Sequence, residues 1–179
     1  DAMAGVINII TNQTPSANTN KLNLGSQYQS NNHLRSLFGH FSGNKKGVNW
    51  NAYGTYKAAQ DYRNKFDGYV FNSKFNQHNF GGYVGYNGEW GFTHFSVSDF
   101  DLTAGMVEGE RDSLGRFIKM MPGGLEAQAT DEDFRSLHPL TPYQHIRHLT
   151  VSSDNRIKMG EAHLTLNLGW QRNKIGRAH

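Results

Sequence analysis

The clearest strand in this sequence occupies residues 48–58 and reads Val48-Asn49-Trp50-Asn51-Ala52-Tyr53-Gly54-Thr55-Tyr56-Lys57-Ala58. Apolar or small residues fill the even-numbered positions, and mostly polar residues fill the odd-numbered ones. Because successive side chains of a strand point to opposite sides, this alternation predicts a strand with one apolar and one polar face. Its length suits a tilted strand that crosses a bilayer, which needs roughly 9–11 residues.

Similar alternating stretches lie on both sides of this strand, at residues 21–29, 33–42, 78–87, 90–101, 144–154 and 160–171. The last of them places Leu164, Leu166 and Leu168 on one face and ends near Trp170. An aromatic residue at a strand end suits the interface between membrane and water. Together, the stretches predict an all-β chain of about seven antiparallel strands.

The lengths of the connections between these stretches depend on whether the connection is even-numbered or odd-numbered along the chain. The second, fourth and sixth are tight, at residues 43–47, 88–89 and 155–159. The third and fifth are long, at residues 60–77 and 102–143, and the first is short, at residues 30–32. Bacterial outer-membrane barrels have short periplasmic turns and longer extracellular loops. This sorting favours a transmembrane barrel over a soluble β-sandwich, whose hairpins have no reason to differ in this way.

The composition agrees with a barrel and excludes several other classes of protein. Hydrophobic residues make up only 36% of the 179 residues, and mean hydropathy is −0.68, yet aromatic residues reach 12%. Such a balance suits a barrel with a polar interior and aromatic girdles. The sequence has no apolar run of roughly 18 residues that would form a transmembrane helix. It has no cysteine, and its net charge of +3 comes without a basic block, so no nucleic-acid partner is expected.

A β-branched motif near the start of the chain reads Gly5-Val6-Ile7-Asn8-Ile9-Ile10-Thr11. It resembles the segment that closes the plug domain of TonB-dependent outer-membrane receptors, although Ala4 stands where the usual pattern has a second glycine or similar small residue. Residues 79–94, 107–112 and 142–155 also resemble the early barrel of such receptors from Bacteroidota-type bacteria. The resemblance extends to about Lys174.

The resemblance implies a division of the chain into four parts. Residues 1–14 would be the C-terminal end of a plug domain, 15–20 a linker, and 21–174 the first part of a transmembrane β-barrel. Residues 175–179 resemble translated sequencing-adapter read-through and are expected to be a non-native tail. The expected fold is therefore a partial transmembrane antiparallel β-barrel of about seven strands, preceded by the last strand of a plug, in a fragment of a larger receptor.

The resemblance also implies a function, which is TonB-energised uptake of a scarce ligand such as a ferric siderophore, haem, cobalamin or an oligosaccharide. The expected location is the outer membrane of a Gram-negative bacterium. The expected partners are outer-membrane lipid, the TonB complex through a part N-terminal to Asp1, and a small extracellular ligand. A passive porin-like or adhesin barrel and a soluble β-sandwich binding module remain alternatives. The sequence upstream of Asp1 discriminates among them, because only the receptor has a whole plug domain there.

Several residue patterns invite a catalytic or metal-binding interpretation. His145 and His148 have the spacing of a zinc pair on a helix, but in a strand they point to opposite faces, so lumen-facing polar positions are the simpler account of His148 and His163. Residues 108–112 are acidic but lack the spacing of a calcium loop. The glycines at 81, 82, 85 and 88 precede no helix and form no phosphate cradle. We therefore expect no catalytic residues, no metal and no cofactor.

The long fifth connection, residues 102–143, is where we expect ligand contacts. Arg135, His138 and Tyr143 are the candidates, because planar cationic and aromatic groups suit anionic or aromatic chelates.

Alanine substitution of Arg135, His138 and Tyr143 together in the full receptor is predicted to weaken ligand binding, because the three contacts are lost at once. Equilibrium binding to whole cells measures the effect. Unchanged affinity would reject these residues as the ligand contacts.

Overall fold

The structure is a computed structural model that describes residues 15–121 and 123–178. Its elements are β1 (Thr19–Gln29), β2 (Leu34–Lys45), β3 (Val48–Ala59), β4 (Arg63–Asn64), β5 (Gly68–Tyr69), β6 (Phe75–Gly88), β7 (Gly91–Gly105), β8 (Ile118–Met121), β9 (Leu125–Gln128), α1 (Asp131–Arg135), β10 (Tyr143–Met159) and β11 (Ala162–Ala178). The motif at residues 5–11 lies outside the described residues.

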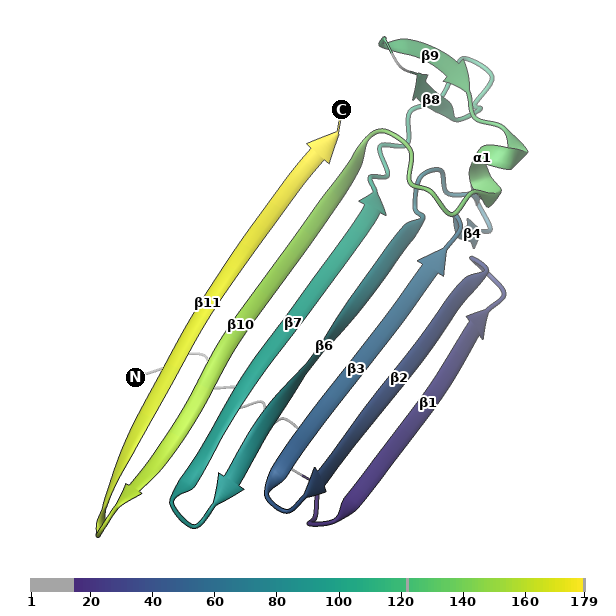
Figure 1. The fold of residues 1–179 in the computed structure, drawn as a ribbon. Helices are drawn as coiled ribbons and strands as arrows, with labels where there is room; N and C mark the ends of the chain where they lie inside the picture. The colour runs from purple at the N-terminus through teal and green to yellow at the C-terminus, as the bar shows by residue number, and fades with distance from the viewer. Residues whose placement is uncertain (1–14, 122, 179) are drawn as a thin grey trace, which may run out of the picture.

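Seven of the strands form one large antiparallel sheet in the order β1-β2-β3-β6-β7-β10-β11. Each long strand therefore pairs with the next long strand along the chain, as Figure 1 shows. The all-β class and the seven predicted strands are confirmed. Within the described residues, β1 and β11 each pair on one side only, so the sheet is open and no closed barrel is present.

The last two strands are longer than the alternation predicts. Residues 155–159 were expected to be a turn, but β10 continues through them to Met159. β11 runs on to Ala178, which is the register partner of Tyr143. The prediction that Trp170 ends its strand is therefore wrong, because β10 offers backbone partners well beyond it. Residues 175–178 belong to β11, and their expected non-native origin stays a prediction.

The three tight turns lie at one end of the sheet and the longer connections at the other (Figure 1). The β2–β3 turn consists of Lys46 and Gly47, whose φ angles are 50° and 85°. Positive φ at both central residues is the requirement of a type I′ turn, whose twist matches that of paired strands. Gly160, with φ 67°, opens the equally short β10–β11 turn. The even-numbered connections are short, as predicted, but the sixth lies at residues 160–161 and not at 155–159.

The third and fifth connections are folded. Residues 60–74 contain the β4–β5 pair, and residues 106–142 contain the β8–β9 pair and α1. We call these two connections together the loop-end cap. Its small core consists of Phe71, Phe117 and Ala129, with Phe134 and Leu140 packed against them. No helix among the described residues is long and apolar enough to cross a membrane.

Gly82 in β6 allows two strands to approach closely. A Cβ atom at this position would lie 2.0 Å from the backbone oxygen of Asn51 in β3. Backbone cannot move away as a flexible side chain can, so any larger residue must push β3 and β6 apart. Gly54 in β3 lacks this constraint, since a Cβ there would meet only the Asn79 backbone oxygen at 3.9 Å.

Gly82→Ala is predicted to destabilise the sheet, whereas Gly54→Ala is expected to be nearly neutral. Overpacking of this kind costs roughly 1–3 kcal/mol. Urea unfolding of the two variants in detergent, followed by circular dichroism, measures the difference. Equal midpoints would contradict the close approach at Gly82.

Candidate functional site

One side of the sheet is apolar across all seven strands. Residues that are partners in an antiparallel ladder project to the same side. The ladder pairings give one continuous row across the sheet: Leu22, Phe41, Ala52, Gly82, Val97, Val151 and Trp170. We call the side that carries this row the apolar face. The row is apolar or small at every strand, although its members come from positions spread over most of the chain.

The opposite side is polar across the same strands. The next row of register partners, adjacent to the apolar row, consists of Asn23, His40, Tyr53, Gly81, Ser98, Thr150 and Gln171. We call this side the polar face. A shift of one residue exchanges the two faces of a strand, so the contrast between the rows depends on a correct register in every pair.

The side chains of the apolar face are exposed in the described part of the chain. Leu24 is 76% exposed and Leu168 is 58% exposed, although each sits inside a long regular strand. Within the described residues, no second layer packs on this face (Figure 1). An apolar surface that extends over several strands is much larger than a typical patch on a soluble monomer, and such a patch marks a protein or membrane contact.

A charged pair limits the apolar face toward the loop end. Asp99 is only 2% exposed, and both its carboxylate oxygens accept hydrogen bonds from Arg147, each at 3.1 Å. The neighbouring Asp101 lies 2.9 Å from Nε2 of His145. A bidentate arginine–carboxylate pair is among the stronger charge-assisted contacts. The charged groups of this strand pair are thus matched where the apolar surface ends.

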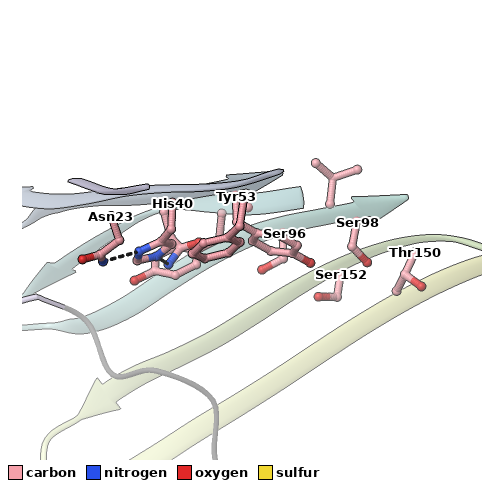
Figure 2. A pocket seen from close by; sticks show the side chains of 12 residues that line it. Asn23, His40, Tyr53, Ser96, Ser98, Thr150 and Ser152 are labelled. Carbon is pink, nitrogen blue, oxygen red and sulfur yellow. Dashed lines mark hydrogen bonds between the residues drawn. The ribbon is translucent and has the colours of Figure 1, made fainter. Parts of the chain in front are cut away.

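The polar face carries a hollow of about 550 Å³. Figure 2 shows its side chains, with His40 hydrogen-bonded to Asn23. One ring nitrogen of His40 lies 3.2 Å from Nδ2 of Asn23, and the other lies 2.8 Å from Nδ2 of Asn51. The remaining wall combines hydroxyl-bearing, aromatic and small or apolar residues: Phe38, Tyr53, Gly82, Tyr83, Ser96, Val97, Ser98, Thr150 and Ser152. Such a wall offers many hydrogen-bonding groups, and the hydroxyl of Thr150 lies 2.7 Å from Nε2 of His148.

A buried ion pair joins the two ends of the third connection. Nζ of Lys74 lies 3.3 Å from Oδ2 of Asp61, and both side chains are fully buried. Burial raises the pKa of Asp61 above its ordinary value, against the opposing effect of Lys74. Burial likewise lowers the pKa of Lys74, against the attraction of Asp61. Because each charge depends on the other, removal of one partner would leave an uncompensated buried charge.

The side chain of Asn72 connects the third connection to both ends of the fifth. It is 1% exposed, and its Nδ2 donates to the carbonyl oxygens of Pro142 at 2.7 Å, Leu140 at 2.8 Å and Met106 at 3.3 Å. Its Oδ1 accepts from the backbone N–H of Leu140 at 2.9 Å. Gly105 leaves space for this side chain, since a Cβ there would lie 2.4 Å from Oδ1. This amide therefore adds four hydrogen bonds to the aromatic core and the ion pair of Arg111 with Asp67, which also join the two connections.

The helix α1 is held in the loop-end cap by Asp133. Oδ2 of Asp133 accepts from the backbone N–H and the hydroxyl of Thr130, both at 2.7 Å, which completes a capping box. Nζ of Lys119 in β8 binds both oxygens of the same carboxylate. Burial alone would raise the pKa of Asp133, but the hydrogen bonds from Lys119 and Thr130 outweigh it, and the net shift is downward.

The three residues predicted to bind ligand all lie at the loop end. Arg135 ends α1 and pairs with Asp131 at 3.5 Å. His138 follows α1, and its backbone N–H donates to the Ser136 hydroxyl at 3.0 Å. Tyr143 is the first residue of β10. Within the described residues, no hydrogen bond, ion pair or ring contact joins any two of the three, and their role in binding stays a prediction.

The ladder also places the two histidines of the spaced pair. His145 is the register partner of Thr103, and His148 of Phe100. These partners differ by an odd number of residues, so the two histidines lie on opposite faces, as predicted. Among the described residues, no three His, Asp or Glu side chains converge as a metal site. Sequence reasoning missed Asp61, Asn72 and Lys74, whose polar side chains resemble ordinary loop residues until the fold brings the two connections together.

Asn72→Ala is predicted to loosen the fifth connection while leaving the sheet intact. Each buried polar group that loses its partner costs about 1–3 kcal/mol. Hydrogen exchange at the Leu140 amide should accelerate strongly. Asn64→Ala is the matched control, because Asn64 bonds only within its own turn, to residues 66 and 67. Equal exchange in both variants would contradict the role of Asn72.

Comparisons with known proteins add no relative to these observations. No protein-family model, no curated protein and no solved structure matches this chain.

Proposed function

We propose that this chain forms part of the wall of an outer-membrane β-barrel, in a receptor of the TonB-dependent class that takes up a small extracellular ligand. The apolar face contacts lipid, and the polar face lines the interior. The tight turns lie on the periplasmic side, and the loop-end cap lies outside the cell. The plug motif at residues 5–11, which resembles that of such receptors, supports the assignment to this class.

The contrast between the two rows is the observation that carries the proposal. Lipid-facing and interior-facing residues alternate along every strand of a transmembrane barrel. In this sheet the alternation holds in register across all seven strands, from Leu22 to Trp170 on one face and from Asn23 to Gln171 on the other. A lipid surface accepts the whole apolar row without a second protein layer, provided that the outer edges of β1 and β11 pair with further strands of the barrel, because unpaired backbone groups are not tolerated in lipid.

The arrangement of the connections supports the orientation. Long loops of outer-membrane barrels lie outside the cell and carry recognition, whereas the periplasmic turns are short. Here the two long connections fold together over one end of the sheet, with their own core at Phe71 and Phe117. A preorganised cap of this kind suits ligand capture, because little ordering remains to be done on binding.

The two alternatives are less well supported. A soluble β-sandwich would bury the apolar face against a second sheet, and the described residues provide none. A passive porin-like or adhesin barrel shares the two-faced wall, but it has no plug and so leaves the motif at residues 5–11 without a role. The receptor accounts for both features.

A pair of neighbouring positions in β11 tests the membrane assignment. The chain contains no cysteine, so Leu166→Cys and Asn167→Cys each introduce a single thiol for a fluorescent label. Leu166 is the partner of Asn155, and Asn167 of Asp154, which places the two on opposite faces. After reconstitution in lipid with brominated acyl chains, we expect strong quenching of the label at position 166 and little at 167.

Equal quenching at the two positions, or quenching at neither, would reject the lipid-facing assignment of the apolar face. Circular dichroism of both labelled variants confirms that strand content is unchanged. The comparison is well matched, because the two sites differ by one residue in depth and share the same strand.

A further inference from the structure

The loop-end cap contains a small cavity that none of the features above requires. Its volume is about 220 Å³, and we call it the loop-end cavity. The lining residues come from the third connection, from both ends of the fifth, and from β8: Phe71, Met106, Glu108, Gly109, Glu110, Ile118, Met120, Thr141 and Pro142. Five of these are apolar, and two are carboxylates.

The cavity walls are joined by hydrogen bonds to the backbone, so its shape is present before any ligand arrives. Asn72 binds the backbone of Met106 and Pro142, and the N–H of Met106 donates to the carbonyl of Pro142 at 2.9 Å. On the other side, the N–H of Ile118 donates to the carbonyl of Glu110 at 3.1 Å. Walls that are fixed in this way lower the entropy cost of binding.

The walls suit an apolar body of limited size. Phe71 supplies an aromatic ring, and Met106 and Met120 supply flexible thioethers that adapt to the shape of a ligand and contact rings favourably. The volume is below the range of roughly 300–1,000 Å³ that is usual for drug-sized ligands. The cavity therefore fits a single ring or a short branched chain.

The charge at the cavity determines which sign of charge on a ligand is favoured. Glu108 and Glu110 are exposed, and within the described residues no ion pair engages either of them. Three nearby cations are paired: Arg111 with Asp67, Arg116 with Asp112, and Lys119 with Asp133. Arg177 donates to Sδ of Met106 at 3.4 Å and has no ion pair within the described residues. An ammonium group would gain attraction from both glutamates.

We propose that the loop-end cavity binds a small amphipathic cation, with an apolar body among Phe71, Met106 and Met120 and an ammonium group at Glu108 and Glu110. A role of this cavity in capturing the transported ligand rests on the function proposed above. Binding of the cation to the cavity can be tested without a membrane. This ligand class differs in charge from the anionic chelates expected for Arg135, His138 and Tyr143, none of which lines the cavity.

Thiol protection in the full 179-residue chain, in detergent, tests the site. Met120→Cys places the only thiol of the chain in the cavity wall, and Met121→Cys is the matched control, because Met121 neighbours it in β8 without lining the cavity. Three probes share a phenyl body and differ in charge: phenethylammonium, 2-phenylethanol and 3-phenylpropionate. The rate of maleimide alkylation is measured against the concentration of each.

Phenethylammonium is expected to slow alkylation of the Met120→Cys thiol at about a tenfold lower concentration than 2-phenylethanol, which corresponds to about 1.4 kcal/mol. 3-Phenylpropionate should not protect, and none of the probes should protect the Met121→Cys thiol. Adding Glu108→Gln and Glu110→Gln should remove the advantage of the amine, whereas Glu161→Gln in the β10–β11 turn, at the other end of the sheet, should preserve it.

Equal protection by all three probes, protection of both thiols, or no protection by the amine would overturn the proposal. These outcomes are independent of the lipid test at positions 166 and 167. Protection without lipid quenching would leave the cavity as a ligand site and reject the barrel wall. Lipid quenching without protection would support the barrel wall and reject the cavity as a ligand site.

Discussion

Backbone hydrogen bonding between neighbouring strands decides on which side of this sheet every side chain lies. With Leu22 opposite Phe41 and Val151 opposite Trp170, the parity of each strand is tied to that of the next. An error of one residue in any pair would carry polar groups to the apolar face. The two-faced surface, the position of the polar hollow and the proposed orientation in a membrane all depend on this register.

The sequence was sufficient to predict the sheet because its signals are local. In β3, the alternation from Val48 to Ala58 is visible within the strand itself, and the Lys46–Gly47 turn that precedes it has a composition typical of hairpins. The far end of β10 was missed because Asn155, Arg156 and Lys158 resemble a turn in composition. Pairing with β7 and β11 overrides that local preference.

The loop-end cap could not be predicted, since its contacts are distant in sequence. The bond from Asn72 to the Pro142 carbonyl spans 70 positions, and no periodicity reports such a pair. The same holds for the loop-end cavity, whose walls come from four separate stretches of the chain. Arg135, His138 and Tyr143 were chosen by residue type alone, and the structure locates them in the expected region without joining them. Residue type indicates what a side chain can bind, but only the fold determines its neighbours.

The contact between Asn72 and Gly105 has a mechanical consequence. Gly105 ends β7, and Lys74, two residues after Asn72, leads directly into β6. The cap is thus attached by direct contacts to the ends of two adjacent central strands. A displacement of the cap therefore acts first on the ends of β6 and β7, because Asn72 lies against Gly105 and the N–H of Gly105 donates to the carbonyl oxygen of Lys74 at 3.0 Å.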